Sequence, residues 1–208
     1  GLGGDDNLMG NGGDDLIDGG AGLDAASYND QRSNYSVRVE LNAWTVASSN
    51  WIDGKDSVIG VERLHFTDRS VALDVYPGGS AHSAALIMRA VFGPSSFSEL
   101  GFVGAGIALL DTGLTFNELV AAAISIPYFE ELAGSRSNGA FVRLVYENVV
   151  GVAPSPGDLR DFTSLLDTGA MTQTELGVFA ALVGINSQSV ELVGFQTSGI
   201  DYLPFPLE

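Results

Sequence analysis

The sequence has no cysteine and a single lysine, Lys55, and both shortages exclude or disfavour particular kinds of site and partner. Without cysteine there is no disulfide, no thiolate zinc site and no cysteine nucleophile. Nine Lys and Arg residues stand against 26 Asp and Glu residues, which gives a net charge of −17. Nucleic acid and anionic membranes are bound through basic patches, so the composition argues against both partners and favours bound cations.

Motifs that carry catalysis are also missing. The two histidines, His65 and His82, do not form a metal-ligand spacing such as H-E-x-x-H. There is no G-x-S-x-G elbow, no P-loop and no dinucleotide fingerprint. The longest nearly apolar run, Phe102 to Leu110, is too short to span a bilayer. We therefore expect no catalytic residues, no organic cofactor and no membrane span, and we expect both histidines to be structural.

What is present is a repeat. Residues 1–27 form three nonapeptides, GLGGDDNLM, GNGGDDLID and GGAGLDAAS. Each has Gly at positions 1 and 4, Asp at position 6 and an apolar residue at position 8. This is the G-G-x-G-x-D-x-U-x pattern of calcium-binding repeats. Because the chain begins inside a repeat, we expect it to be part of a longer array.

The chemistry of the pattern suits a hard cation. Ca²⁺ prefers six to eight oxygen ligands, glycine permits tight turns that direct carbonyl oxygens inward, and one Asp per loop adds charge. The remaining x-U-x is a short strand whose apolar residue points into a narrow core. The candidate ligands are the position-6 carboxylates and the loop carbonyls: Asp6, Asp15, Asp24, Gly1, Gly3, Gly4, Gly10, Gly12, Gly13, Gly19, Ala21 and Gly22.

The period also predicts which loops meet. If nine residues make half a turn of a parallel coil, loops on the same edge lie 18 residues apart. Asp6 and Asp24 should then share one edge and enclose one ion. Asp15 lies on the other edge, with a partner loop either upstream of Gly1 or at Tyr28–Ser33. A flexible Gly/Asp linker is the alternative interpretation of residues 1–27, but three repeats in register favour the coil.

Residues 34–76 change to the alternating pattern of half-buried strands. Strands are expected at residues 35–41, 44–47, 58–66 and 71–75, separated by turn signals such as Asp53-Gly54 and Thr67–Ser70. We expect this segment to form a strand cap that covers the open end of the coil. Residues 77–82 are expected to be a linker.

Residues 83–208 are expected to form an all-α domain of two degenerate helical repeats. Leu109–Gly113 recurs as Leu165–Gly169, and a capping box follows each copy, at Thr115–Glu118 and Thr172–Glu175. The two Asp-Thr-Gly turns spell the aspartic-protease tripeptide, but each Asp ends an expected helix and each Gly suits a helix C-terminus. We interpret both turns as structural and the Glu130-Glu131 pair as solvated surface.

Three stretches carry a family resemblance. The nonapeptides resemble RTX (haemolysin-type) repeats, and residues 54–75 resemble the strand cap that often follows such arrays. Phe141–Gly151, with the pattern F-x-x-x-x-Y-x-x-x-x-G, and the Leu-Asp-Thr-Gly turns resemble an uncharacterised helical repeat domain near the C-terminus of bacterial type I secreted proteins. That family usually has Tyr-Trp in the helix before the turn. Phe162 takes the Trp place in copy two, whereas copy one has Gly106.

The resemblance implies a mixed fold: a short parallel β-roll at 1–33, a β-strand cap at 34–76 and the helical domain. It implies a non-enzymatic Ca²⁺-binding module, secreted from a Gram-negative bacterium through type I secretion machinery and folding on extracellular calcium. The tail, Phe195–Pro206, resembles the usual end of the helical domain and is a candidate for the secretion signal. Two alternatives stay open: an adhesion module that binds cell-surface glycan, and the non-catalytic part of a secreted enzyme.

Overall fold

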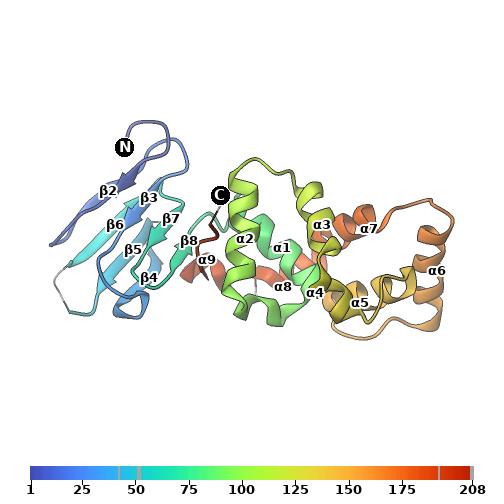
Figure 1. Ribbon diagram of the computed structural model, residues 1–208. Coiled ribbons are helices and arrows are strands. Elements are labelled where there is room, and N and C mark those ends of the chain that lie inside the picture. The colour runs from blue at the N-terminus through green and yellow to red at the C-terminus, as the bar shows by residue number, and fades with distance from the viewer. Residues whose placement is uncertain (42, 51–52, 192, 207–208) are drawn as a thin grey trace. The chain divides into compact units, whose positions relative to one another are not determined.

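The computed structural model describes residues 1–41, 43–50, 53–191 and 193–206. It contains both α-helices and β-sheets, which confirms the predicted mixed class. The chain divides into two compact units (Figure 1). Unit 1 comprises Gly1–His82 together with Gly194–Glu208, and unit 2 comprises Ser83–Val193.

Unit 1 is built from two β-sheets. Among the described residues, one sheet has five strands in the order β1-β3-β7-β8-β9 and the other has four in the order β2-β6-β5-β4. A single-turn 3-10 helix at Arg32–Asn34 precedes β4. The strands are β1 (Asn7–Leu8), β2 (Leu16–Asp18), β3 (Ala25–Ser27), β4 (Tyr35–Glu40), β5 (Ala43–Ser48), β6 (Lys55–Ile59), β7 (Arg63–His65), β8 (Ser70–Ala72) and β9 (Ile200–Tyr202).

Successive nonapeptides place their strands in alternate sheets. β1 pairs with β3 in parallel, with Asn7 opposite Ala25, whereas β2 lies in the other sheet. The predicted pairing of loops two repeats apart is therefore confirmed. The apolar position-8 residues point between the sheets: Ile17 and Ala26 are buried, and Leu8 packs against the same core. This core also contains Tyr28, Tyr35 and Phe66, whose rings lie in mutual contact.

The strands of residues 34–76 extend the two sheets. β6 pairs in parallel with β2, and β7 pairs in parallel with β3. The single strand predicted at 58–66 is wrong, because Gly60, with φ of +58°, breaks it into β6 and β7. The alternation predicted for 35–41 holds only at its start: Tyr35 and Val37 are buried, but Val39 and Leu41 are exposed. The core covers only the first half of that hairpin.

Unit 2 is helical and follows the predicted repeat. Copy one contains α1 (Ser80–Phe92), whose first turn starts in unit 1, α2 (Leu100–Asp111), α3 (Phe116–Ser125) and α4 (Pro127–Ala133), with a 3-10 helix at Pro94–Ser98. Copy two contains α5 (Asn138–Val150), α6 (Pro156–Asp167), α7 (Gln173–Leu182) and α8 (Gly184–Glu191). Because α1 begins at Ser80, the predicted linker 77–82 is partly helical.

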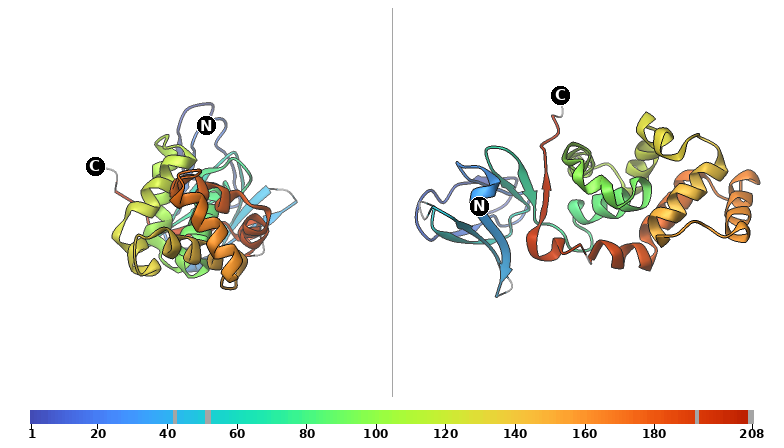
Figure 2. Two further views of the ribbon diagram at one scale, coloured as in Figure 1. Left: turned by 90° about the vertical axis from the view of Figure 1, so that its right-hand side faces the viewer. Right: turned by 90° about the horizontal axis from the view of Figure 1, so that it is seen from below.

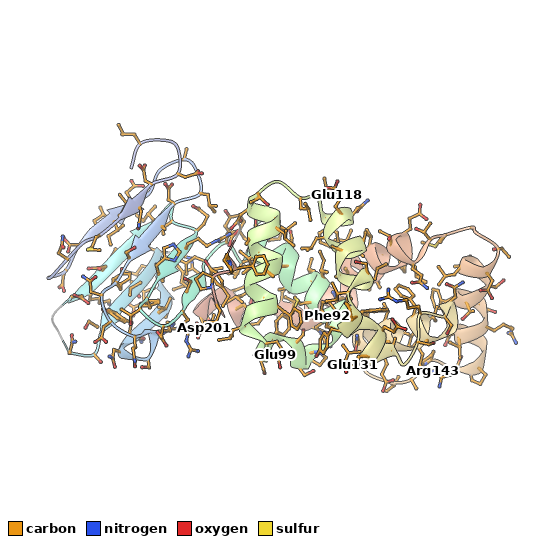
Figure 3. The ribbon with its side chains drawn as sticks, in the orientation of Figure 1. Phe92, Glu99, Glu118, Glu131, Arg143 and Asp201 are labelled. Carbon is orange, nitrogen blue, oxygen red and sulfur yellow. The ribbon has the colours of Figure 1, made fainter. Side chains whose placement is uncertain are left out.

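Local sequence explains the ends of these helices. Both predicted capping boxes are present, at Thr115–Glu118 before α3 and Thr172–Glu175 before α7. Figure 3 shows Glu118 at the start of α3. In both Asp-Thr-Gly turns the Asp ends a helix, and Gly113 and Gly169 have positive φ, which confirms the predicted place of these turns at helix C-termini.

The tail departs from the prediction. It was expected to complete the helical domain, but it belongs to unit 1. A short helix, α9 (Phe195–Ser198), is followed by β9, which pairs antiparallel with β8 (Figures 1 and 2). Ile200 and Tyr202 alternate with Asp201 and are buried, so the tail covers an otherwise open sheet edge.

Candidate metal centre

The position-6 carboxylates stack along two loop edges of unit 1. On the first loop edge the Asp6 amide donates to Asp24 Oδ1 at 2.8 Å, and the Asp24 amide donates to Glu62 Oε2 at 2.9 Å. On the second loop edge the Asp15 amide donates to Asp56 Oδ1 at 3.0 Å. The first loop edge therefore consists of Asp6, Asp24 and Glu62, and the second of Asp15 and Asp56.

Two predictions about these edges have different outcomes. Asp6 and Asp24 share an edge, as predicted. The partner proposed for Asp15 at Tyr28–Ser33 is wrong, since Asp56 pairs with it and the Tyr28 hydroxyl instead donates to Asp56 Oδ2 at 3.1 Å. Because a hairpin is inserted between β3 and β6, Asp56 does not lie at a position that the nine-residue period predicts.

Glycines at the two repeat positions serve different purposes. At position 4, Gly4 and Gly13 have φ of +99° and +106°, a conformation that favours glycine. Gly22 at position 4 also has positive φ, and a Cβ there would collide with the Gly4 carbonyl.

At position 1 the requirement is space. A Cβ on Gly1 would collide with Asp6 Oδ2 and the Gly19 carbonyl oxygen, and a Cβ on Gly10 would lie 2.9 Å from Asp15 Oδ2. A Cβ on Gly19 would collide with the Gly60 carbonyl oxygen and lie 2.7 Å from Asp24 Cβ. At least one oxygen atom thus lies in the space beside each position-1 glycine.

Asp24 is the least exposed of the predicted ligands. Its side chain is fully buried, and its Oδ2 has no hydrogen-bond partner among the described residues. Asp15 Oδ2 is in the same situation, although Asp15 itself is partly exposed. Burying a carboxylate oxygen without a partner is costly, and a bound cation removes that cost. The residues present therefore fit a hard cation.

Carboxylates alone do not complete such a site. Within the described ranges, no group of three or more His, Asp or Glu side chains is arranged to hold a metal. Loop carbonyls would supply the other ligands. Gly3 bridges to Ala21, and the Ala21 carbonyl accepts a hydrogen bond from the Gly4 amide at 2.9 Å. Gly12 lies in the exposed loop before Asp15, and Gly13 lies next to Gly54.

Sequence analysis missed Asp56 and Glu62. The signal that could have found them is the order acidic-x-apolar at positions 6–8 of each nonapeptide, as in Asp24-Ala25-Ala26. The same order occurs in Asp56-Ser57-Val58 and Glu62-Arg63-Leu64. Burial raises the pKa of the Asp56 and Glu62 carboxyl groups, and the nearby charges of Asp15 and Asp24, respectively, raise it further. Both loop edges therefore concentrate negative charge that a cation would neutralise.

The remaining candidate groups have structural surroundings. His65 Nδ1 lies 2.9 Å from Ser70 Oγ, and burial lowers the pKa of the His65 ring. His82 is buried in the first turn of α1. Asp167 Oδ1 accepts a hydrogen bond from Asn138 Nδ2 at 2.8 Å. Glu130 and Glu131 are exposed, as expected, and Glu130 forms an ion pair with Arg136.

Unit 2 contains two apolar cavities at equivalent places in its repeats. One, of about 170 Å³, lies among α1, α2 and α3, and the other, of about 160 Å³, lies among α5, α6, α7 and the start of α8. Gly106 lines the first where Phe162 lines the second. Apart from the Tyr146 hydroxyl, the lining side chains carry no hydrogen-bonding oxygen or nitrogen, so they do not offer the polar groups that orient a sugar.

No protein-family model matches the chain, and no significant match appears among curated proteins. No helix among the described residues is long and apolar enough to cross a membrane.

The register of the loops predicts unequal roles for neighbouring carboxylates. Asp5 at position 5 is exposed, and its Oδ1 accepts a hydrogen bond from the Leu23 amide at 2.9 Å. Asp24→Asn and Asp5→Asn each keep an oxygen for the amide they bind. We expect Asp24→Asn to raise the calcium Kd about tenfold or more, equivalent to ~1.4 kcal/mol, and Asp5→Asn to change it less than about threefold. Calorimetric titration measures both, and equal losses would contradict the assigned register.

Proposed function

We propose that unit 1 is a calcium-binding β-roll of the RTX type, in which residues 1–33 form the coil and 34–76 its strand cap. The observation that carries the proposal is Asp24, a fully buried carboxylate with an oxygen that lacks a hydrogen-bond partner among the described residues. Asp24 stacks on Asp6, which lies 18 residues away in the sequence, as the repeat predicts. When bound, Ca²⁺ would neutralise the stacked carboxylates. Asp6 and Asp24 would hold it together with carbonyls of the two loops they close.

We further propose that the chain is a non-enzymatic module of a secreted bacterial protein. In low cytosolic calcium the seven acidic residues within the first 31 positions repel one another, and no basic residue offsets them. Unit 1 then stays unfolded, which suits passage through a type I exporter, and it folds outside the cell. Unit 2 has an ordinary apolar core with Phe129, Phe141 and Ile107 fully buried, so it needs no metal.

The test separates the two units spectroscopically. Both tryptophans, Trp44 and Trp51, lie in unit 1, and Trp44 packs against its core, so tryptophan fluorescence reports on that unit alone. We expect EDTA to produce the fluorescence of exposed tryptophan while far-UV circular dichroism keeps its helical signal. Calcium should then restore the buried emission.

The size of the effect follows from the affinity. Extracellular calcium modules bind with a Kd of about 10⁻⁴–10⁻³ M, so 10 mM Ca²⁺ should stabilise unit 1 by roughly 1.4–2.7 kcal/mol. Magnesium at the same concentration is the control, since Mg²⁺ gives up its water ligands reluctantly. Identical fluorescence in EDTA and calcium, or loss of the helical signal in EDTA, would count against the proposal.

A further inference from the structure

We infer that the calcium-binding edge continues past the repeats, and that a second ion binds between the Gly19–Asp24 loop and the Gly60–Glu62 turn of the strand cap. This inference rests on the proposed function. It adds a site, and a ligand, Glu62, that lie outside the nonapeptide sequence.

The two places share two contacts. Asp24 Oδ1 accepts from the Asp6 amide at 2.8 Å, and Glu62 Oε2 accepts from the Asp24 amide at 2.9 Å. The Gly19 carbonyl oxygen occupies the Cβ position of Gly1, and the Gly60 carbonyl oxygen occupies that of Gly19. The first place therefore combines the Asp6 and Asp24 carboxylates with the Gly19 carbonyl. The second combines the Asp24 and Glu62 carboxylates with the Gly60 carbonyl.

Asp24 lies at the junction of the two places. Its Oδ1 is occupied by the Asp6 amide, while Oδ2 is buried and has no hydrogen-bond partner among the described residues. Asp24 itself is fully buried, so water does not solvate this oxygen from the surface. A carboxylate oxygen can bridge two cations, so Asp24 is placed to serve both ions, whereas Asp6 serves only the first and Glu62 only the second.

The turn at Gly60 differs from a repeat loop in length. Glu62 follows Gly60 by two positions, whereas Asp24 follows Gly19 by five. Glutamate is one methylene longer than aspartate, and its Oε2 still reaches the Asp24 amide. Because its side chain is longer, Glu62 makes from a shorter turn the same contact with a backbone amide that Asp24 makes from a full loop.

The second loop edge does not repeat this arrangement. Asp56 Oδ1 accepts from the Asp15 amide and Oδ2 accepts from the Tyr28 hydroxyl, so both oxygens already bind protein donors. Asp56 is also almost fully buried. We therefore assign Asp56 a structural role, and the additional ion proposed here lies on the first loop edge.

The experiment counts bound ions. Equilibrium dialysis of the full chain against saturating Ca²⁺, followed by metal analysis, gives the stoichiometry for the wild type, Asp6→Asn, Glu62→Gln and Asp24→Asn. The amides at positions 24 and 62 keep an oxygen for the neighbouring backbone N–H, so these changes remove charge and preserve the stacking. We expect Asp6→Asn and Glu62→Gln each to lose one ion and Asp24→Asn to lose two. Glu131→Gln, on the exposed surface of unit 2, is the charge-matched control and should lose none (Figure 3).

Each outcome decides a separate point. A wild type that binds no calcium would overturn the proposed function. A wild type that binds calcium, with Glu62→Gln binding as many ions, would overturn this inference alone. If Glu62→Gln does not fold, the comparison of Asp24→Asn with Asp6→Asn still decides, because equal losses from those two variants would exclude a shared carboxylate.

Discussion

Replacing Asp74 with alanine is expected to lower the free energy of unfolding of unit 1 by about 3–5 kcal/mol, the usual cost of removing one partner from a buried ion pair. Asp74 Oδ1 pairs with Arg63 Nη1, and both side chains are only 4–5% exposed. Asp74 Oδ2 also accepts from the amides of Ser80 at 2.7 Å and Ala81 at 3.3 Å, which begin α1. One carboxylate therefore neutralises a buried guanidinium and caps a helix.

Loss of this ion pair should also affect the first loop edge. Arg63 Nη1 donates to the Glu62 carbonyl at 2.8 Å, so the Asp74–Arg63 pair holds the backbone of the turn that carries Glu62. Urea unfolding in saturating calcium, followed by tryptophan fluorescence, measures the loss. Arg38→Ala is the matched control, because the Arg38–Glu40 pair also lies in unit 1, its Arg38 side chain is 56% exposed, and such pairs contribute ~0–1 kcal/mol. A loss from Asp74→Ala no larger than that of the control would contradict the assigned role.

The sequence predicted those parts of the fold that repeat or that depend on near neighbours. The capping boxes at Thr115 and Thr172 involve residues three apart, and both helix starts follow. The stacking of Asp6 on Asp24 depends only on the period, which three nonapeptides define. Local rules are sufficient wherever the partner is close in sequence or lies at a fixed offset.

The partners of Asp15 and Asp24 in the cap could not be predicted in the same way. Asp56 and Glu62 lie 41 and 38 residues downstream, beyond a hairpin of irregular length that interrupts the period. Strand pairing across such an insertion is decided by which apolar residues fill the core, here Val58 beside Ile17 and Leu64 beside Ala26. Gly60 supplies the positive φ that separates the two strands.

The role of the position-1 glycines was also predicted incompletely. All repeat glycines were expected to serve tight turns, and the position-4 residues Gly4, Gly13 and Gly22 do so. Gly10 and Gly19 do not have positive φ, and a Cβ on Gly1, Gly10 or Gly19 would meet the position-6 side chain of its own repeat. Sequence alone cannot distinguish a glycine needed for its backbone angle from one needed for its missing side chain.

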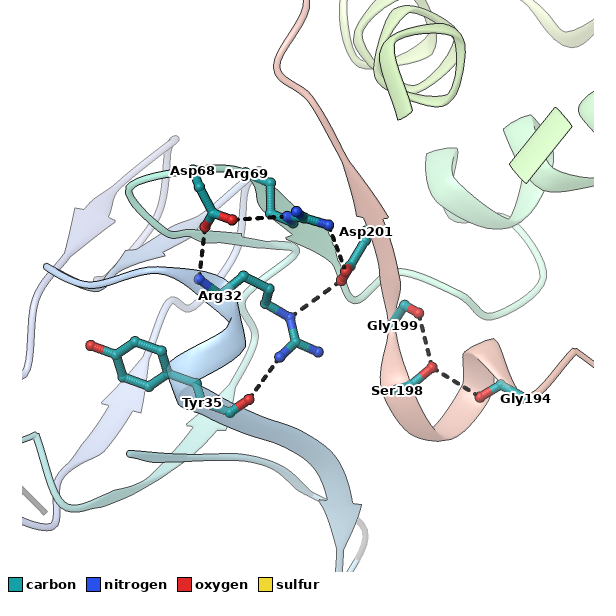
Figure 4. A network of polar contacts seen from close by, with 8 residues as sticks. All are labelled: Arg32, Tyr35, Asp68, Arg69, Gly194, Ser198, Gly199 and Asp201. Carbon is teal, nitrogen blue, oxygen red and sulfur yellow. Dashed lines mark hydrogen bonds and ion pairs between the residues drawn. The ribbon is translucent and has the colours of Figure 1, made fainter. Parts of the chain in front are cut away.

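The C-terminal segment contributes more to unit 1 than its position in the sequence predicted. β9 is only three residues long and is followed by prolines, so its alternation is too short to identify it as a strand. The structure pairs it with β8, and Asp201 forms ion pairs with Arg32 at 3.2 Å and Arg69 at 3.8 Å (Figure 4). Asp68 completes this network by accepting from the Arg32 amide and pairing with Arg69.

Truncation before Gly199 is therefore expected to destabilise unit 1 by roughly 3–6 kcal/mol, because Ile200 and Tyr202 are buried and each such side chain contributes about 1.5–3 kcal/mol. It also leaves the β8 edge of Ser70–Ala72 without its neighbouring strand. A dispensable secretion signal would behave differently, since its removal would reduce export and leave folding intact. We expect the two losses to occur together.

Two matched variants separate the contributions to this effect. Truncation after Tyr202 keeps β9 and removes Leu203 and Phe205, which are largely exposed, so calcium-dependent melting should stay close to that of the full chain. Asp201→Ala keeps the strand and removes two partly exposed ion pairs, for which we expect a combined loss of about 1 kcal/mol or less. The melting transition of unit 1, followed by tryptophan fluorescence, is compared with secretion of the same variants into the medium. An unchanged transition in the chain truncated before Gly199, with export abolished, would show that the segment acts as a signal and that β9 contributes little to the fold.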